Sequence, residues 1–285
     1  MISLNFLEMV MTILDNAQED HISFSQINQW LGCQKQYWLQ RVMKQEPVDV
    51  SSALIVGTAY HTAVEMFYKA RMARDKPVSH MELISVFERV ILEDEGKQVI
   101  NWGRSNRDKE IEKADGVFQA FLDEEQENEV IAVEKMFRLD IEGLPPVIGR
   151  VDLVEQDKSG AIVIIDFKSA ATKPSVSSDI HVPGDVDSSH QMTLYQMWGK
   201  QNWPEQDIKL RMDYLIKSVR NPVFLPIKTT RSEEQEKQLV VLMKSVYEQI
   251  QMSKAGVINA VPVRSWKCNG CGHRVNCNIG INTAA

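Results

Sequence analysis

The residues of this chain that could do chemistry gather between Gly149 and Lys168. Gly-Arg-Val-Asp ends at Asp152, and Asp-Phe-Lys runs from Asp166 to Lys168, each within a run rich in Val and Ile. A carboxylate inside an apolar run is costly unless it is paired or bound to a metal. An isolated Asp-x-Lys occurs by chance in many proteins, where it is an ion pair at the end of a core strand. The alternative is a divalent-metal site, in which the two carboxylates hold Mg²⁺ or Mn²⁺ beside the lysine.

Two strands joined by a tight turn would position these side chains. Residues 147–154 and 161–167 have strand composition, and Asp-Lys-Ser-Gly at 157–160 is typical of a turn. An antiparallel hairpin centred on residue 159 would place Asp152 opposite Asp166. Lys168 follows Asp166 by two residues, so both would lie on one face of the strand.

Three other segments carry polar residues at suggestive spacing. Residues 57–74 have a helical apolar pattern, on which His61 and Glu65 share a side. Such a histidine is usually a surface or satisfied core residue. Glu134 begins a strand expected at 130–139, either as an edge-strand charge or as support for the hairpin. Gln191 and Tyr195 share a face of the helix that follows, where they would ordinarily be surface and half-buried residues.

Taken together, these pieces resemble the RecB-like nucleases of the PD-(D/E)XK superfamily. Each motif is weak alone, but their order and distances over roughly residues 20–280 are specific. The motifs, in chain order, are Gly57-x-x-x-His61, the lone Glu134, Gly149-x-x-Asp152, Asp166-x-Lys168 and Gln191-x-x-x-Tyr195.

The resemblance implies a role for each of these residues. His61, Asp152 and Asp166 would hold one or two Mg²⁺ or Mn²⁺ ions, and Lys168 would position the nucleophile or stabilise the transition state. The same resemblance gives supporting or DNA-contacting roles to Glu134, Gln191 and Tyr195. Glu65 is expected to fix the imidazole of His61, as metal-bound histidines usually require.

The chain has four cysteines, one early and three late. Cys268 and Cys271 form a C-x₂-C pair, Cys277 follows, and Cys33 alone would be interpreted as a buried apolar residue. Four thiolates suit either zinc or a [4Fe–4S] cluster, and spacing does not separate the two. The resemblance to CRISPR-associated RecB-like nucleases and the AddB-type nuclease domain favours the iron–sulfur cluster. His273 replacing a thiolate in a zinc site is the minor alternative.

The expected fold is mixed α/β, a PD-(D/E)XK core with a central mixed sheet flanked by helices and an N-terminal helical portion. The iron–sulfur cluster would join the N- and C-terminal regions. Residues 1–20 are expected to form a helix, with 1–14 as a candidate self-association contact, and residues 21–285 a single nuclease domain. Its parts would be a helical portion (57–128), the catalytic sheet and helix (130–230) and a C-terminal helix with the cysteine segment (232–285). The Ser-, Pro- and Gly-rich residues 170–189 would form a substrate-covering loop.

Composition limits the classes of function. The 285 residues are 44% apolar with a formal net charge of −7 and a pI near 5.5, which suits a globular protein and argues against coating nucleic acid through the overall field. The charges of both signs at 104–113 are most simply a solvated helix face. Residues 1–14 are too short to span a bilayer and lack a basic region, so we expect a cytoplasmic protein without a membrane partner.

These observations predict a metal-dependent deoxyribonuclease, an exonuclease on single-stranded DNA ends. It would act in CRISPR adaptation or in phage or prokaryotic recombination and repair, with a helicase, CRISPR or recombination complex as partner. One alternative is a non-catalytic nucleic-acid-binding partner that keeps the fold. The other is a structural zinc protein in which Asp166 and Lys168 form only an ion pair. Polarity, endonucleolytic against exonucleolytic mode, DNA against RNA, and oligomeric state are left open.

Overall fold

The computed structural model describes residues 21–124, 127–171 and 186–277. The predicted helix at 1–20 lies outside the described residues, as does most of the predicted loop at 170–189. The chain divides into two compact units. The central unit comprises residues 49–137 and 150–236, and the terminal unit comprises the described residues before 49, from 138 to 149, and after 236.

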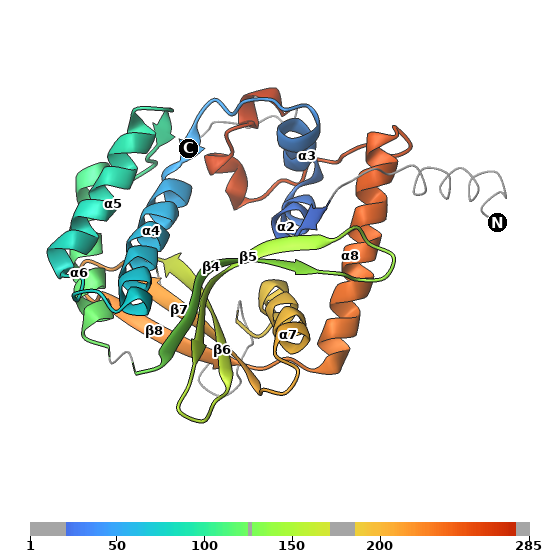
Figure 1. Cartoon of the computed structure of the whole chain (residues 1–285). Helices are drawn as coiled ribbons and strands as arrows, with labels where there is room; N and C mark the ends of the chain where they lie inside the picture. The colour runs from blue at the N-terminus through green and yellow to red at the C-terminus, as the bar shows by residue number, and fades with distance from the viewer. Residues whose placement is uncertain (1–20, 125–126, 172–185, 278–285) are drawn as a thin grey trace, which may run out of the picture. The chain divides into compact units, whose positions relative to one another are not determined.

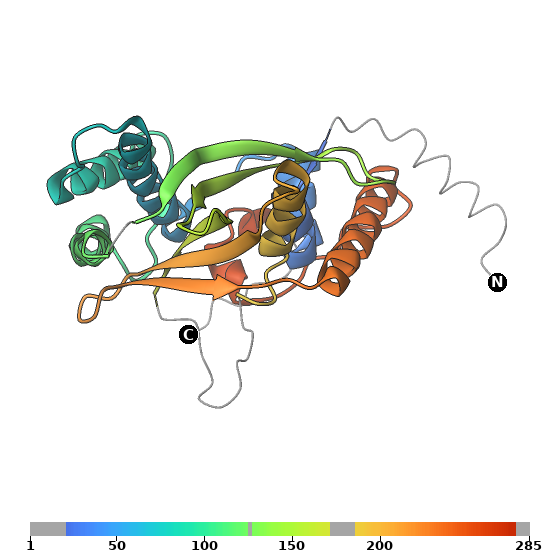
Figure 2. The ribbon, with the colours of Figure 1, turned by 60° about the horizontal axis from the view of Figure 1, so that its bottom comes forward.

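The central unit is built on a mixed sheet. Its strands β5 and β6 are antiparallel, β6 and β7 are parallel, β7 and β8 are antiparallel, and β4 pairs with β5. Figure 2 shows β7 and β8 as neighbouring orange strands. The strand bounds are β4 Glu129–Leu139, β5 Val147–Gln156, β6 Ile162–Ala170, β7 Ile208–Ile216 and β8 Val223–Thr229. The predicted mixed α/β fold with a central sheet flanked by helices is confirmed.

The sheet of the central unit carries helices on both faces. Helices α4 (Ser52–Ala73), α5 (His80–Glu95) and α6 (Arg107–Leu122) form one core with Val163, Ile165 and Phe167 of β6. Helix α7 (His190–Asn202) covers the other face, where a Cβ added at Gly199 would lie 2.7 Å from Ile164 Cδ1. Figure 1 shows α4–α6 to the left of the strands and α7 to the right. Alternation along β6 thus supplies apolar side chains to both layers.

The β5–β6 hairpin has the register that the sequence predicts. Leu153 faces Ile165 and Val154 faces Ile164, so the next pair toward the open end is Asp152 and Asp166. The turn is held by Asp157, whose Oδ1 accepts hydrogen bonds from the backbone N–H of Ser159 at 2.8 Å and of Ala161 at 3.1 Å. These local bonds fix the hairpin, and the hairpin fixes which carboxylates meet.

The apolar pattern predicts helices at 81–100 and 104–128, and both end earlier. Helix α5 stops at Glu95 rather than residue 100, because Ile100–Asn101 (β3) pairs in parallel with Val50–Ser51 (β2). Helix α6 ends at Leu122 rather than residue 128.

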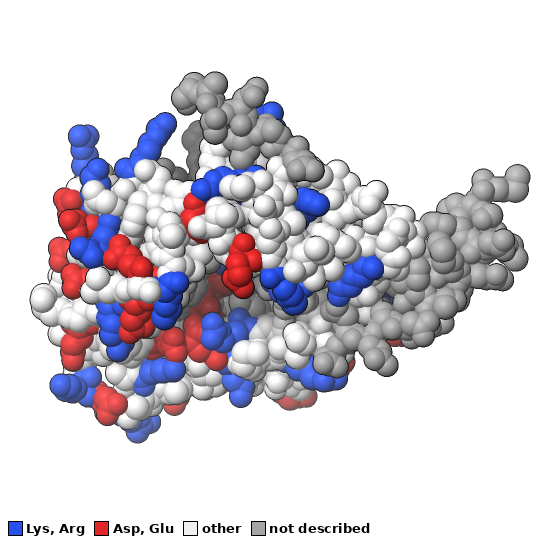
Figure 3. Space-filling view, turned by 90° about the horizontal axis from the view of Figure 1, so that it is seen from above, with Lys and Arg blue, Asp and Glu red and all other residues white. Residues whose placement is uncertain are grey.

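The charges around α6 form ion pairs such as Lys113–Glu110 (2.5 Å) and Arg107–Glu95 (3.1 Å). Figure 3 shows basic and acidic residues interspersed on its left side, where Figure 1 places α5 and α6. The exposed charges agree with a solvated helix face, whereas Glu110 is buried at 6% exposure and pairs with Lys113.

The terminal unit contains the first and last described segments. Strand β1 (Ile22–Ser23) pairs in parallel with the start of β5, and Ser23 caps helix α2 (Phe24–Gly32). The sequence predicts Ser25 as the N-cap, because Ile27, Trp30 and Leu31 follow it at core spacing, and this prediction is wrong. The Gln26 side chain accepts from the backbone N–H of Ser23 at 2.9 Å and completes a capping box that Ser25 has no partner to form. The other elements are α3 Gln34–Tyr37, a π-helical turn η1 Trp38–Val42, α8 Glu233–Lys254, which begins in the central unit, and the 3₁₀ turns η2 Trp266–Gly270 and η3 Arg274–Asn276.

Within the described part of the chain, no helix combines the length and apolar character that a membrane span requires.

Candidate active site

The two aspartates of the hairpin lie at its open end, and the carboxylate of each has a partner on β6. Asp152 Oδ2 accepts a hydrogen bond of 2.8 Å from the backbone N–H of Phe167. Asp166, whose exposed fraction is 1%, pairs through Oδ2 with Lys168 Nζ at 2.7 Å. The apolar strand therefore carries a buried carboxylate that is matched to the lysine two residues further on, as the spacing predicts.

Helix α4 and strand β4 bring two more ligand-type side chains to Asp152. One donor atom each from His61, Glu134 and Asp152 lies within 4.8 Å of the others. His61 Nδ1 is 3.6 Å from Asp152 Oδ2. Glu134 adopts a φ of 51°, a left-handed conformation that is rare for a non-glycine residue inside a strand. Such a conformation costs on the order of 1 kcal/mol or more and persists where the surroundings enforce it.

The electrostatics of this group favour a cation. Burial, together with the neighbouring Asp166, raises the pKa of Asp152 to about 7. Burial and the charge of Asp152 likewise raise the pKa of Glu134. Burial lowers the pKa of His61, which keeps the imidazole neutral, the form that binds metals. Two crowded carboxylates and a neutral imidazole fit a divalent ion, because a bound cation removes the repulsion between the carboxylates.

The sequence motif and the structure select overlapping sets of metal ligands. The motif predicts His61, Asp152 and Asp166, with Glu134 in support. The structure groups His61, Glu134 and Asp152, while Asp166 pairs with Lys168. Asp166 remains close enough to raise the pKa of Asp152 through its charge. Among the described residues, the structure thus places Glu134, rather than Asp166, with His61 and Asp152 as a candidate ligand.

Helix α7 supports the lysine through a chain of hydrogen bonds. Lys168 Nζ donates to Gln191 Oε1 at 3.0 Å, and Gln191 Nε2 donates to Tyr195 Oη at 2.8 Å. The Tyr195 hydroxyl in turn donates to the backbone carbonyl of Arg150 at 2.9 Å and lies 3.4 Å from Asp166 Oδ1. The structure thus brings Gln191 and Tyr195 to the site, one helical turn apart on a single face.

Glu65 takes a different partner from the one expected. Its carboxylate pairs with Lys69, one turn further along α4, at 2.5 Å. Its charge still contributes to raising the pKa of Glu134, so it borders the site. A role for Glu65 in orienting His61 stays a prediction.

Sequence reasoning missed two arginines. Arg150 Nε lies 2.5 Å from Glu134 Oε2, and its place two residues before Asp152 on β5 was the available signal. Arg231 is 8% exposed and anchors the segment before α7 by donating to the carbonyl of Val186 at 2.6 Å and to Thr193 Oγ1 at 3.1 Å. No motif marks Arg231, because its partners come from three separate segments.

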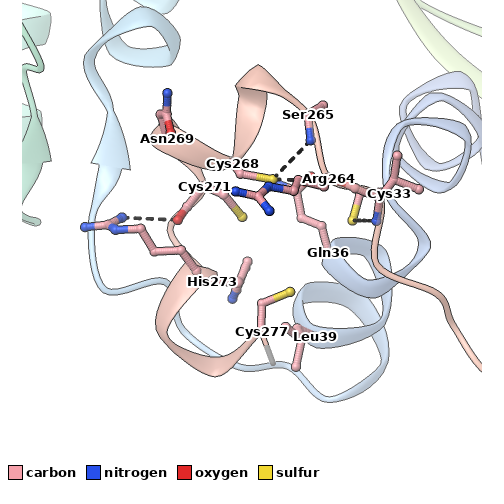
Figure 4. Close-up of a pocket in the computed structure, with 12 residues that line it drawn as sticks. Cys33, Gln36, Leu39, Arg264, Ser265, Cys268, Asn269, Cys271, His273 and Cys277 are labelled. Carbon is pink, nitrogen blue, oxygen red and sulfur yellow. Dashed lines mark hydrogen bonds between the residues drawn. The ribbon is translucent and has the colours of Figure 1, made fainter. Parts of the chain in front are cut away.

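The four cysteines line one cavity of about 130 Å³ in the terminal unit. Figure 4 shows their sulfur atoms around this cavity together with the ring of His273. All four are free thiols, and Cys33 comes from the end of α2 whereas the others come from η2, η3 and their flanks. Backbone hydrogen bonds bring these segments together, for example Val48 N–H to Gly272 O at 2.9 Å. The structure thus brings together all four cysteines singled out in the sequence.

The cavity has the chemistry of a metal site. Backbone N–H groups of Val263 and Ser265 point at Cys33 Sγ (3.5 Å) and Cys268 Sγ (3.4 Å), as amides do toward thiolate ligands. His273 is 3% exposed, and its Nδ1 has no hydrogen-bond partner among the described residues. Burial raises the pKa of the Cys271 thiol, which a bound cation would reverse. Four converging thiols and one unpartnered buried nitrogen fit a metal or an iron–sulfur cluster.

The fold and the carboxylate site are those of a nuclease that works with divalent metal ions. The family model of the PD-(D/E)XK nuclease superfamily matches residues 21–278. The chain therefore belongs to the PD-(D/E)XK nuclease superfamily, and its substrate class is nucleic acid.

Comparison with solved structures shows that this chain shares its fold with another protein. No curated protein matches the chain. A candidate exonuclease from Eubacterium rectale aligns over 100% of this chain and 96% of its own, with a TM-score of 0.57 and 13% identity. At this identity the likeness shows the fold alone. The solved structure of the protein SSO0001 aligns over 97% of both chains at 13% identity, but its TM-score of 0.38 carries no argument.

Proposed function

We propose that this protein is a metal-dependent deoxyribonuclease that hydrolyses phosphodiester bonds. The observation that carries the proposal is the convergence of His61, Glu134 and Asp152 within 4.8 Å, beside the ion pair of Asp166 and Lys168. Carboxylates, an imidazole and an ammonium in this arrangement are what metal-assisted phosphodiester cleavage needs. The metal ligands are His61, Asp152 and Asp166, as the motif predicts, together with Glu134.

Each side chain has a defined task in this reaction. A bound Mg²⁺ or Mn²⁺ supplies charge neutralisation and lowers the pKa of a water molecule. Lys168, oriented by Asp166 and Gln191, donates a hydrogen bond that aligns the attacking water or stabilises charge on the phosphate. Tyr195 keeps Gln191 in place. The neutral imidazole of His61 leaves a nitrogen lone pair available for the ion.

The four cysteines hold a [4Fe–4S] cluster in this proposal. Sulfur-rich donor sets favour iron–sulfur clusters or zinc over hard cations such as Mg²⁺. The cluster would connect α2 to the segment after α8 and so stabilise the terminal unit. We assign the chain to the RecB-like, iron–sulfur group of the superfamily, with residues 21–285 as one nuclease domain, because β4, β5 and α8 each run through both units.

The proposed substrate is single-stranded DNA attacked from an end. The resemblance to RecB-like nucleases supports exonucleolytic cleavage, and the description of the Eubacterium rectale protein as a candidate exonuclease points the same way. The proposed settings are CRISPR adaptation and phage or prokaryotic recombination and repair, with a helicase or recombination complex as partner.

The experiment that tests the function compares cleavage of end-labelled single-stranded DNA, duplex DNA and RNA with Mn²⁺. Asp166→Ala and Lys168→Ala should each lower the rate at least about 100-fold while the protein stays folded and keeps its iron. Lys209→Ala is the matched control, because Lys209 forms a comparable 2.7 Å ion pair with Asp157 away from the site and is similarly exposed. Full cleavage by either site variant contradicts the site assignment.

Metal analysis of anaerobically purified protein tests the cysteine site. We expect about four irons per chain and a broad absorption near roughly 400 nm, both lost in Cys33→Ser. One zinc and no iron would instead indicate the structural zinc site, and His273→Ala would then show whether His273 is a zinc ligand.

A further inference from the structure

The exposed side chain of Arg150 contacts one of the proposed metal ligands, Glu134. It precedes Asp152 by two residues on β5, so both side chains leave the strand on the same face. Its Nε contacts Glu134 Oε2 at 2.5 Å, and the exposed fraction of the side chain is 62% for Arg150 and 11% for Glu134. A solvated guanidinium therefore neutralises a nearly buried carboxylate of the candidate ligand group.

The backbone of Arg150 is fixed while its side chain is free to change partners. The carbonyl of Arg150 accepts the 2.9 Å hydrogen bond from Tyr195, and the next residue, Val151, has an exposed fraction of 0%. Beyond that anchored backbone, the guanidinium extends on a long, exposed stem. A new position of this group requires only rotations about side-chain bonds.

Arg150 and a divalent ion would compete for Glu134. Arg150 contacts Glu134 through Oε2, and a carboxylate oxygen of Glu134 belongs to the donor group formed with His61 and Asp152. An ion bound there neutralises the carboxylate and repels the guanidinium, so the ion pair loses its main attraction. The displaced guanidinium stays within a side chain's length of the site, as a planar fork of N–H donors without a carboxylate partner.

We propose that Arg150 exchanges partners during the reaction cycle. It neutralises Glu134 before the metal binds, and then contacts a phosphate of the substrate next to the scissile bond. The inference rests on the proposed nuclease function. Phosphate is the partner that fits, because guanidinium binds it through two parallel hydrogen bonds and a nucleic acid substrate brings phosphates to the metal ligands. Arg150 is thus a substrate-binding residue whose availability depends on metal occupancy.

The test uses Arg150→Gln, with Arg138→Gln as the matched control. Arg138 is 61% exposed and pairs with Asp140 at 2.8 Å, so it has similar exposure and a similar ion pair but does not contact a proposed metal ligand. The first measurement is the Mn²⁺ affinity of the DNA-free protein. Binding is detected as the loss of the electron paramagnetic resonance signal of unbound Mn²⁺. The second is the affinity for single-stranded DNA with Mn²⁺ at several salt concentrations, in a Lys168→Ala background that prevents cleavage.

Two results together support the exchange. Arg150→Gln should bind Mn²⁺ more tightly than the parent protein, by up to about 10-fold, because the competing cation is gone. It should bind DNA about 10-fold more weakly at low salt, and the slope of log affinity against log salt should become shallower by about 0.7, the value for one phosphate contact. Arg138→Gln should match its parent in both measurements.

Other outcomes overturn it. Weaker Mn²⁺ binding by Arg150→Gln would mean that Arg150 only holds Glu134 in place for the metal, and unchanged Mn²⁺ binding would mean that Arg150 does not compete with the ion. An unchanged salt slope would mean that Arg150 contacts no phosphate. If the parent protein itself binds no Mn²⁺, or binds no DNA in the Lys168→Ala background, the proposed function fails rather than this inference alone.

Discussion

The hydroxyl group of Tyr195 joins the catalytic lysine to the backbone of β5, and its removal in Tyr195→Phe tests whether this connection holds the site. The hydroxyl accepts from Gln191 Nε2 at 2.8 Å and donates to the carbonyl of Arg150 at 2.9 Å. Gln191 in turn accepts from Lys168 at 3.0 Å. The substitution removes one oxygen atom from a residue that is 1% exposed and leaves the packing of the ring unchanged.

The magnitude follows from the two groups that lose their partner. An amide hydrogen and a carbonyl in a largely dry environment each cost about 1 kcal/mol when left unpaired, so the free energy of unfolding should fall by about 2 kcal/mol. For a protein of this size that lowers the thermal midpoint by about 4–8 °C. Cleavage should fall about 10-fold, because Gln191 no longer fixes the ammonium of Lys168.

Tyr60→Phe provides a control with the same change of chemistry. Tyr60 is 0% exposed, and its hydroxyl has no hydrogen-bond partner among the described residues. Removing an unpaired buried hydroxyl should leave stability unchanged or raise it by about 1 kcal/mol, with no effect on cleavage. The assays are urea denaturation and single-turnover cleavage with Mn²⁺. Equal loss of stability in both variants, or full activity in Tyr195→Phe, would refute the reasoning.

Two further predictions concern packing and pH. Gly199→Ala should lower the free energy of unfolding by about 1–3 kcal/mol, since the new Cβ would lie 2.7 Å from Ile164 Cδ1. Gly32→Ala, where a Cβ meets nothing within 4 Å, should not destabilise the protein in the same urea titration. In metal-free protein, stability should fall as pH rises from about 4 to about 7, because folding raises the pKa of Asp152 from 3.8 to about 7 and the folded state binds more protons there. Saturating Mn²⁺ or Asp152→Asn should make the free energy of unfolding depend less on pH over this range. If neither changes the pH dependence, the prediction is contradicted.

The catalytic hairpin could be predicted from local sequence. Alternation in β5 and β6 and the turn at Asp157 set the register without reference to the rest of the chain. The encounter of Asp152 with Asp166, and the shared face of Asp166 and Lys168, follow from that register. The sequence also predicts strands at 209–218 and 222–229, and they form as Ile208–Ile216 and Val223–Thr229.

Helix ends were harder to predict, because tertiary partners decide them. The apolar stripe of α5 continues toward residue 100, but Ile100 pairs with Val50 as a strand instead. Ser23 and Ser25 are both capping residues by type. Ser23 caps α2 because β1 leaves its backbone extended and Gln26 returns a hydrogen bond.

The positions of Glu134 and Arg150 depend on contacts that sequence patterns do not specify. Glu134 looked like an edge-strand charge or a supporting residue, and its left-handed φ of 51° has no signature in composition. The approach of Glu134 to His61 requires α4 to pack on the sheet through the apolar core. Arg150 was visible in its motif, but its ion pair with Glu134 was not.

The sequence by itself determined the hairpin, the face on which its charges lie, and the four cysteines as a potential ligand set, because turn chemistry and strand alternation act over a few residues. The tertiary structure alone decided that Glu134 joins His61 and Asp152 and that Tyr195 ties Lys168 to β5. It also brings together two sets for which the sequence offered only a resemblance, namely His61 with Asp152 and Cys33 with the other three cysteines. The physical reason is that periodicity specifies which face of an element is apolar. Which distant faces then meet is settled by the packing of the whole core.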